Sequence, residues 1–220
     1  MKNNILILGA TGRTGELAVK YALEKGFAVT ALVRNPDKIK MQSDHLTVIK
    51  GSPTDIEDVR KAMKNCRYVI SLMSALSDKE SFSFKKIEAP QTLKKTMQNV
   101  ITVMKENNIK RVMTLSSIGA GDSYPYAPWF MKLMMKLTNF KLVFEDHNAQ
   151  EELLMQSGLD WTIARPVGLN NENAKSNLVV SYDKTPKPFK MSRAQLSQFF
   201  IHQIDKPDYI HKIPILSEKS

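Results

Sequence analysis

The sequence predicts an α/β fold: a doubly wound, mostly parallel sheet with helices on both faces. Short apolar runs of strand length alternate along the chain with segments of helical periodicity. Strands separated by helices of about 10–15 residues form βαβ units with parallel strands and right-handed crossovers. A glycine-rich turn also joins the first apolar run to the first helical segment, which is typical of this fold class.

Six apolar runs are the predicted strands, and four segments of helical periodicity are the predicted helices between them. The strands are Asn4–Leu8, Ala28–Val33, Leu46–Lys50, Tyr68–Leu72, Arg111–Ser116 and Trp161–Ala164. The helices lie near Gly12–Lys25, Asp55–Met63, Pro90–Asn107 and Phe144–Ser157.

The pattern weakens beyond Pro166, although no flexible linker separates this region from the rest. Three further elements are expected there: a short strand at Leu178–Tyr182, a helix from Ser192 and a last apolar segment at Ile210–Leu216. Residues 167–220 are therefore expected to complete the substrate side of the same fold. The sequence thus predicts a single domain over residues 1–220.

Composition indicates an ordinary globular protein. Of its 220 residues, 42% are hydrophobic and 25% are charged, and no apolar segment approaches the roughly 20 residues that span a bilayer. The first strand begins almost at once, so no targeting peptide is expected. The single cysteine, Cys66, cannot form an intrachain disulfide and is interpreted as an inert thiol. We therefore expect a cytoplasmic protein without a membrane partner.

Nucleic acids and metal ions are not expected as ligands. The net charge is +10, but lysine and arginine are spread over the whole chain without a basic run that contains aromatic residues. A diffuse positive field instead suits an enzyme that recruits phosphate-bearing or acidic ligands. The histidines lack paired metal-ligand spacing. They are His45, His147, His202 and His211.

Residues 5–15, Ile-Leu-Ile-Leu-Gly-Ala-Thr-Gly-Arg-Thr-Gly, form the most informative motif of the chain. In such a motif Gly9 allows a tight turn, Gly12 lets the backbone approach a pyrophosphate, and Gly15 lets the helix pack closely against the sheet. The exposed amides and the positive end of the helix dipole then hold the anion. The strand–turn–helix context therefore predicts a dinucleotide site. Its predicted residues in this turn are Gly9, Thr11, Gly12, Arg13 and Thr14.

The end of the second strand predicts which nicotinamide cofactor binds. An acidic residue about 20 positions after the glycines would hydrogen-bond a free ribose 2′-hydroxyl. This chain has Leu32-Val33-Arg34-Asn35 there. A guanidinium suits a 2′-phosphate, and Arg13 is a candidate for a second positive contact. We therefore expect NADP(H) rather than NAD(H); the alternative is that Arg34 is only a solvated side chain.

Together with four further segments, the glycine turn resembles the atypical short-chain dehydrogenases of the NAD(P)H-binding, NmrA-like group. Within that group the chain is most similar to the biliverdin reductase B and flavin reductase type. The resemblance covers nearly the whole chain. It is carried by Gly9–Gly15, Ala31-Leu-Val-Arg-Asn-Pro36, Val69-Ile-Ser-Leu72, Thr114-Leu-Ser-Ser117 and Ser157-Gly-Leu-Asp-Trp-Thr-Ile-Ala-Arg-Pro166.

The resemblance implies a single Rossmann-like domain with NADP(H) lying over the strand ends. The residues that it implies around the cofactor follow four of the predicted strands. They are Gly51 and Ser52 near the adenine, Leu72 and Met73 beside the nicotinamide-side ribose, and Ser116, Ser117 and Pro166 around the nicotinamide. Many relatives have an aspartate at the position of Ser52.

The larger dehydrogenase class uses a Tyr-x-x-x-Lys pair on the helix before the Ser-Gly-Leu segment. Counting back from Ser157 places the two positions at Val143 and His147, so the pair is absent. Alcohol–ketone interconversion needs such a donor, because an alkoxide forms as hydride arrives. A flavin or a linear tetrapyrrole instead accepts hydride into a delocalised ring system. The missing pair and the resemblance therefore both favour a flavin reductase-like activity.

Two residues are candidates for catalytic groups. Ser117, at the end of the fifth strand, is predicted to orient the substrate or the nicotinamide. His147 is a candidate proton source, because the pKa of a histidine lies near the working range. The alternative is that His147 is a helix residue without a catalytic role, which faces solvent or caps a neighbour.

Two functions of different classes stay open. The first is an NADPH-dependent reductase that transfers hydride to a flavin or a similar conjugated acceptor. The second is a non-catalytic sensor that binds NADP(H) and reports redox state to a protein partner. An epimerase or dehydratase acting on a nucleotide-linked substrate ranks last, because the C-terminal region is short.

The segment 127–144 is rich in methionine and aromatic residues. It is interpreted as a lid over a flat apolar substrate, as a core-facing helix or as a subunit contact. The sequence leaves these alternatives open, and likewise whether the protein is a monomer or a dimer.

Overall fold

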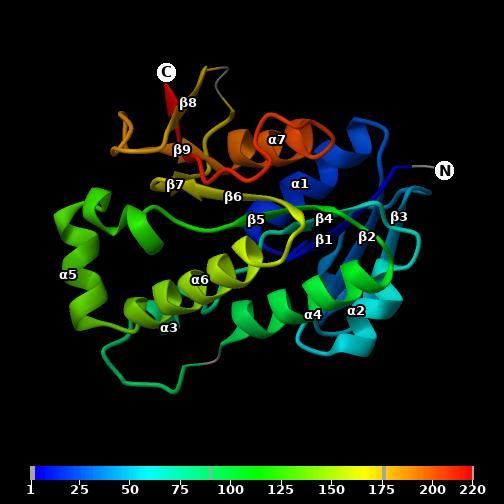
Figure 1. Cartoon of the computed structure of the whole chain (residues 1–220), viewed down its shortest axis with the longest axis horizontal. Coiled ribbons are helices and arrows are strands. Elements are labelled where there is room, and N and C mark those ends of the chain that lie inside the picture. The colour runs from blue at the N-terminus through cyan, green and yellow to red at the C-terminus, as the bar shows by residue number, and fades with distance from the viewer. Residues whose placement is uncertain (1–2, 90, 175–176, 220) are drawn as a thin grey trace.

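The structure, a computed structural model, describes residues 3–89, 91–174 and 177–219 (Figure 1). The strands are β1 (Asn4–Leu8), β2 (Ala28–Val33), β3 (Leu46–Lys50), β4 (Tyr68–Ser71), β5 (Arg111–Leu115), β6 (Asp160–Pro166), β7 (Leu169–Asn170), β8 (Asn177–Ser181), β9 (Met191–Ser192) and β10 (Ile215–Lys219). The helices are α1 (Arg13–Glu24), α2 (Ile56–Met63), α3 (Asp78–Ser81), α4 (Thr92–Glu106), α5 (Trp129–Leu137), α6 (Phe140–Met155) and α7 (Arg193–Gln203), with 3₁₀ turns η1 (Pro36–Lys38) and η2 (Gly121–Tyr126).

Eight strands form one sheet in the order β3-β2-β1-β4-β5-β6-β10-β8. The pairs from β3 to β10 are parallel, and the edge strand β8 pairs with β10 in antiparallel fashion. Helices α1 and α7 pack together on one face, and α2, α4 and α6 cover the other (Figure 1). The predicted α/β fold, a doubly wound and mostly parallel sheet, is therefore confirmed.

The first strand illustrates why the strands read as continuous apolar runs. Successive side chains of a strand point to opposite faces of the sheet. Ile5 and Ile7 pack in the cluster beneath α1 and α7, whereas Leu6 and Leu8 pack in the cluster beneath α2 and α4. Because both faces are covered by helices, neither alternate position of the strand is polar.

Most predicted elements are observed to within two residues, and the larger differences lie around α5 and α6 and at the last strand. Helix α6 begins at Phe140 rather than near Phe144, and α5 was not predicted as a separate helix. The last strand is Ile215–Lys219 rather than 210–216, because residues 207–212 form turns. Pro90, the predicted first residue of a helix, lies outside the described residues, and α4 begins at Thr92.

The break between α5 and α6 depends on contacts far along the chain. The Thr138 hydroxyl donates to the carbonyl oxygen of Met134 at 2.9 Å and closes α5. The Asn139 side-chain nitrogen donates to the carbonyl oxygens of Glu80 and Lys85, at 3.1 and 2.8 Å. Helix α3 and the loop after it therefore fix where α5 ends and α6 begins.

No helix in the described part of the chain is long and apolar enough to cross a membrane. Cys66 is buried, with its thiol 3.4 Å from the carbonyl oxygen of Ala62. Burial raises the pKa of this thiol to about 11. It is therefore protonated at neutral pH, which agrees with its interpretation as an inert cysteine.

Candidate functional site

The carboxyl ends of the parallel strands form one edge of the sheet. The strand order changes direction between β1 and β4, and in open α/β sheets ligands bind at such a switch point. The residues predicted to bind the cofactor all follow strands at this edge. They are Gly9, Thr11, Gly12, Arg13 and Thr14 after β1, Arg34 after β2, Ser52 after β3, Leu72 and Met73 after β4, Ser116 and Ser117 after β5, and Pro166 at the end of β6.

Two glycines of the motif after β1, Gly9 in the turn and Gly15 in the first turn of α1, have no room for a side chain. Gly9 has a φ of +81°, and a Cβ there would lie 2.6 Å from the carbonyl oxygen of Leu72. A Cβ on Gly15 would lie 2.0 Å from the carbonyl oxygen of Gly9. The α1 N-terminus therefore packs directly on the turn, whereas the sequence suggested that Gly15 serves packing against the sheet. This tight turn ends at Gly12, the N-cap residue of α1, and fits a diphosphate held by backbone amides.

Arg34 stands at the end of β2 beside this turn. Its side chain is exposed, and it makes no ion pair with any residue in the described ranges. Arg13 is the first residue of α1 and is also exposed. The sheet thus brings two guanidinium groups to the same edge as the glycine turn, and their contact with a 2′-phosphate stays a prediction.

A carboxylate lies beside Ser52 although the chain has no aspartate at that position. The backbone nitrogen of Ser52 donates to Oδ2 of Asp58 at 3.0 Å. A Cβ on Gly51 would lie 2.6 Å from the Asp58 carboxyl carbon. Asp58 belongs to α2 and was missed in the sequence, where the only signal was an acidic residue six positions after Ser52.

A cavity of about 640 Å³ opens at the ends of β4, β5 and β6. Six predicted site residues line it: Arg13, Met73, Ser116, Ser117, His147 and Pro166. Much of the remaining wall is apolar and comes from Phe130, Met131, Met134, Phe140, Val143, Phe144 and Phe189. The other predicted residues, Gly9, Thr11, Gly12, Thr14, Arg34, Ser52 and Leu72, lie outside this cavity along the same edge. The segment 127–144 therefore contributes to a pocket wall.

The titratable side chains of this cavity are few. Among the described residues, Arg13, Arg193 and His147 line it, and no tyrosine, lysine or carboxylate does. Val143 and His147, which occupy the positions of the missing Tyr-x-x-x-Lys pair, both line it from α6. The cavity thus lacks the usual phenol donor at the place where the count along the sequence puts it.

A larger hollow of about 850 Å³ lies at the opposite edge of the sheet, where the strands begin. The buried Arg111 lines this hollow and donates hydrogen bonds to the backbone oxygens of Asp160, Gln203 and Ile204. These bonds tie β5 to the end of α7. This hollow is remote from the glycine turn, and Arg111 has a structural role.

The two catalytic candidates line the same cavity from different elements. Ser117 is half-buried after β5, and its hydroxyl donates to the carbonyl oxygen of Ile118 at 3.2 Å. His147 is buried on α6. Nothing in the described part of the structure hydrogen-bonds one to the other. The pair is therefore not a linked acid–base couple.

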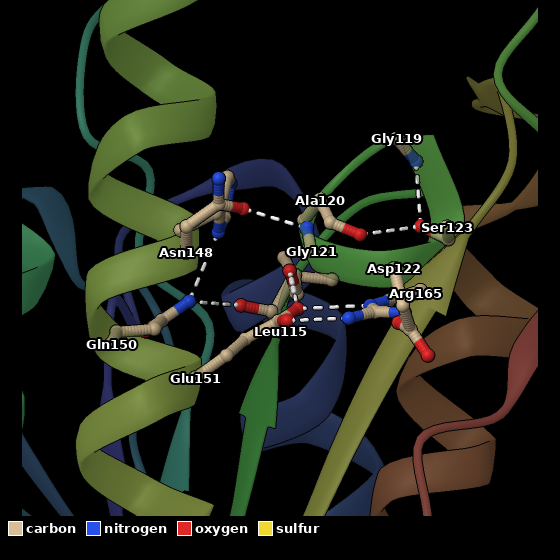
Figure 2. Close-up of polar contacts among 12 residues, drawn as sticks. Leu115, Gly119, Ala120, Gly121, Asp122, Ser123, Asn148, Gln150, Glu151 and Arg165 are labelled. Carbon is tan, nitrogen blue, oxygen red and sulfur yellow. Dashed lines mark hydrogen bonds and ion pairs between the residues drawn. The ribbon is translucent and has the colours of Figure 1, made fainter. Parts of the chain in front are cut away.

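Gln150 fixes the tautomer of His147. Its Nε2 lies 2.9 Å from the carbonyl oxygen of Leu115 (Figure 2), and a carbonyl can only accept. The same Nε2 lies 2.9 Å from Nδ1 of His147, while Oε1 accepts from the Thr114 hydroxyl at 3.2 Å. Nδ1 of His147 therefore accepts a hydrogen bond, and Nε2 carries the proton of the neutral ring.

The pKa of His147 is lower than the sequence led us to expect. This pKa is lowered to about 4, mainly by burial; the Asp146 charge raises it, and the Arg165 charge lowers it. The Asp146 carboxylate is already engaged, since it accepts from the backbone nitrogens of Leu93 and Lys94, at 2.9 Å each. The expected pKa near the working range is therefore wrong. At neutral pH His147 is an uncharged hydrogen-bond donor rather than a protonated acid.

We expect this shift to appear in the pH dependence of stability. A histidine with a folded pKa of about 4 stabilises the protein fully above its unfolded pKa, near 6.5, and this contribution is lost as pH falls to 4. The loss is about 3 kcal/mol. We expect the free energy of unfolding, measured by urea denaturation between pH 7 and 4, to depend less steeply on pH for His147→Gln than for the wild type. His45→Gln, which changes an exposed histidine, is the control and should keep the wild-type dependence of the free energy of unfolding on pH. An equal dependence for all three proteins would contradict the shift.

A buried ionic network supports the wall between β5 and β6 (Figure 2). The Glu151 carboxylate accepts from Nε and Nη2 of Arg165, at 3.0 and 2.6 Å, and from the Ser116 hydroxyl at 2.5 Å. Nη1 of Arg165 donates to Asp122 at 2.5 Å. The hydroxyl proton of Ser116 is therefore directed into the protein and away from the cavity.

This network was not predicted from the sequence. Arg165 belongs to one of the segments that carry the family resemblance, but it received no role, and Glu151 received none either. Glu151 lies on α6 one turn after His147, and no pattern in the sequence connects it with Arg165. Within the described residues no group of three or more histidine, cysteine or acidic side chains is arranged to hold a metal ion.

The sequence model of a family described as NAD(P)H-binding matches residues 9–207. The chain belongs to this NAD(P)H-binding family. The match covers the glycine turn, every strand from β2 to β9 and the walls of the cavity. The resemblance to the NAD(P)H-binding group of atypical short-chain dehydrogenases is therefore confirmed, and so is the prediction of a nicotinamide cofactor.

Curated relatives of this NAD(P)H-binding protein are distant. An uncharacterized chloroplastic protein of Arabidopsis thaliana is 24% identical over 95% of this chain and 74% of its own length. Cinnamoyl-CoA reductase 1 of Petunia hybrida is 31% identical over 53% of this chain. The aligned part is only 35% of that reductase.

Solved structures show the same fold over the whole chain. The anaerobillin reductase ChuY from Escherichia coli O157:H7 has a TM-score of 0.80 at 22% identity, covering 99% of this chain and 98% of that one. A short-chain dehydrogenase/reductase from Veillonella parvula in complex with NADP has a TM-score of 0.75 at 18% identity, covering 100% and 96%. At these identities the likeness establishes the Rossmann-like fold.

Proposed function

We propose that the protein is an NADPH-dependent reductase that transfers hydride to a flavin or a similar conjugated acceptor. The observation that carries this proposal is the cavity at the ends of β4, β5 and β6. Its wall is aromatic and methionine-rich, and no tyrosine or lysine among the described residues lines it. Such a wall suits a flat apolar ring, and an acceptor with a delocalised ring does not need a phenol donor. We also propose a cytoplasmic location.

The chain would hold the cofactor through its backbone and two arginines. The turn at Gly9–Gly12 and the N-terminus of α1 present amides to the diphosphate. Arg34 offers a charge-assisted contact to the 2′-phosphate, and Arg13, which lines the cavity from the first turn of α1, offers one to the diphosphate. NADPH, when bound, supplies the hydride. Binding over β1 and β4 would orient its nicotinamide end toward Met73, Ser117 and Pro166.

The cavity residues would position the acceptor. Met131, Met134 and Phe144 pack on a ring and exclude water from one side of it. His147 offers an uncharged Nε2–H, which orients an acceptor carbonyl or ring nitrogen by a hydrogen bond. Because the His147 pKa is about 4, this ring does not act as the acid near neutral pH. The proton that accompanies reduction would come from solvent.

The proposal is tested by mixing the purified protein with NADPH and excess FMN or riboflavin. We expect oxidation of NADPH above the background rate, followed as the loss of its absorbance. Phe144→Ala should raise the KM for the acceptor, because it removes a ring from the cavity wall. Tight binding of NADPH without turnover of any acceptor would overturn the reductase and favour the redox sensor.

The cofactor preference gives a separate prediction. Arg34→Ala should weaken NADPH binding roughly 10- to 100-fold, since a hydrogen bond to a charged group is lost, and leave NADH binding unchanged. Arg67→Ala is the matched control, because Arg67 is an exposed arginine that precedes β4 at the opposite edge of the sheet. Titration of the three proteins with both nucleotides measures the effect. An unchanged preference in Arg34→Ala would remove this residue from the 2′-phosphate site.

A further inference from the structure

Exposed large apolar side chains gather in two segments of the chain. Ten such side chains are exposed among the described residues, and eight of them lie in the ranges 82–87 and 124–137. They are Phe82, Phe84, Ile87, Tyr124, Trp129, Phe130, Leu133 and Leu137. Contiguous exposed apolar surface of this kind usually marks an interaction site.

The two segments form one surface, which we name the docking face (residues 82–87 and 124–137). The Phe82 ring stacks on Phe140, with centroids 5.3 Å apart, directly after α5. The Asn139 side chain bonds the carbonyl oxygen of Lys85 at 2.8 Å. Phe82 and Phe130 also line the cavity, so the cavity opens onto the docking face. Figure 1 shows α5 at one end of the molecule, beyond the sheet.

Helix α5 is apolar on two sides. Met131 and Met134 line the cavity, and Met135 packs in the core beneath the helix. On the outer side Trp129, Leu133 and Leu137 follow a spacing of four and form an exposed stripe, with Trp129 76% exposed. A helix at the surface of a water-soluble domain normally has one polar side. The outer stripe of α5 therefore lacks the partner that its composition indicates.

The charges around the stripe indicate the chemistry of that partner. Lys132 and Lys136 lie on α5, and residues 124–141 contain no aspartate or glutamate, whereas Lys141 pairs with Glu145 at 3.4 Å. Lys85 and Lys86 add two further exposed cations from the other segment, where Glu80 and Glu88 are the exposed acids. A second copy of the chain would bring lysines against lysines. An apolar surface that carries negative charge is the complement of this face.

We propose that the docking face binds the surface of an anionic lipid bilayer, with α5 lying in the interface between headgroups and acyl chains. Aromatic and leucine side chains on one side of a helix, with lysines beside them, are the pattern of helices that lie in this plane. Lysines near the surface add attraction to anionic lipids. No membrane partner is expected from the sequence, because no segment is long enough to span a bilayer, but a helix that lies in the interface does not need to span it. The proposal is independent of the reductase reaction.

The test uses the full-length protein and two kinds of vesicle. One kind contains phosphatidylcholine alone, and the other contains phosphatidylcholine with phosphatidylglycerol. We expect co-sedimentation with the anionic vesicles, weakened by added salt, and a blue shift of tryptophan emission as Trp129 leaves water. Trp161, the other tryptophan, is buried and provides a constant background.

Variants separate the docking face from the rest of the surface. The double change Trp129→Ser and Leu133→Ser should weaken vesicle binding tenfold or more, because two large apolar side chains are removed. Lys136→Glu should weaken binding to the anionic vesicles only. Tyr182→Ser and Met155→Ser are the controls, since both residues are exposed and lie outside the docking face. All variants should keep the wild-type unfolding temperature.

Three results would overturn the proposal. The first is no binding to either vesicle. The second is equal binding to both vesicles, which would remove the role of the lysines. The third is a dimer, measured by light scattering, that Leu133→Ser dissociates, because the stripe would then be covered by a second copy of the chain.

Discussion

Replacing Glu151 by leucine is expected to lower the free energy of unfolding by about 3–5 kcal/mol. Glu151 and Arg165 are both buried, with 2% and 4% of their side chains exposed, and the Glu151 carboxylate accepts two bonds from the guanidinium. Removing the carboxylate leaves an uncompensated charge in the interior. Asp122, which also pairs with Arg165, is 84% exposed, so its charge is screened by water and compensates little.

Urea denaturation measures this effect, and the same helix provides the control. Glu145→Leu removes an exposed acid that pairs with Lys141 at 3.4 Å, and should cost less than about 1 kcal/mol. The double variant Glu151→Leu with Arg165→Met should recover part of the loss, because a buried pair replaced by apolar residues is often nearly neutral. A cost for Glu151→Leu as small as that of Glu145→Leu would show that Arg165 finds another counter-charge.

Gly15→Ala is expected to weaken NADPH binding at least about tenfold and to cost about 1–3 kcal/mol of stability. The new Cβ would lie 2.0 Å from the carbonyl oxygen of Gly9. That oxygen is backbone and accepts from the nitrogen of Gly12 at 2.9 Å, so the turn itself must move. The amides proposed to hold the diphosphate would move with it.

Gly26→Ala is the matched control, because it tests a glycine change without a clash. Gly26 follows α1 with a φ of +82°, and nothing lies within 4 Å of a Cβ there. This variant should lose about 1 kcal/mol through backbone strain and keep the wild-type affinity for NADPH. Titration with NADPH and thermal unfolding compare the two. Wild-type affinity in Gly15→Ala would place the diphosphate elsewhere.

The fold was predictable because its signals are local. A strand buried on both faces is an uninterrupted apolar run, and the glycine turn lies within a few residues of its strand and helix. The ends of α5 and α6 were not predictable, since Asn139 is held by the loop near Glu80 and Lys85. Contacts of this length in sequence leave no periodic pattern.

The candidate site also has features that the sequence predicts from local signals and features that depend on contacts between distant residues. The positions along the strand ends followed from the motif and the resemblance. The pairing of Glu151 with Arg165 joins α6 to β6 and has no local signature. The pKa of His147 could not be predicted either, because the value of about 4 results from burial, which depends on how α6 packs.

The anchoring of α6 gives the cavity two unlike walls. Asp146 binds the start of α4, Gln150 binds the backbone of β5 and Glu151 binds β6, whereas α5 packs mainly on α6. Amide hydrogens of α6 should therefore exchange with solvent more slowly than those of α5. A ligand would meet a stiff wall that carries His147 and a compliant wall that carries the methionines of α5. Such a pocket would be strict about where an acceptor places its polar atom and tolerant of the size and outline of its rings.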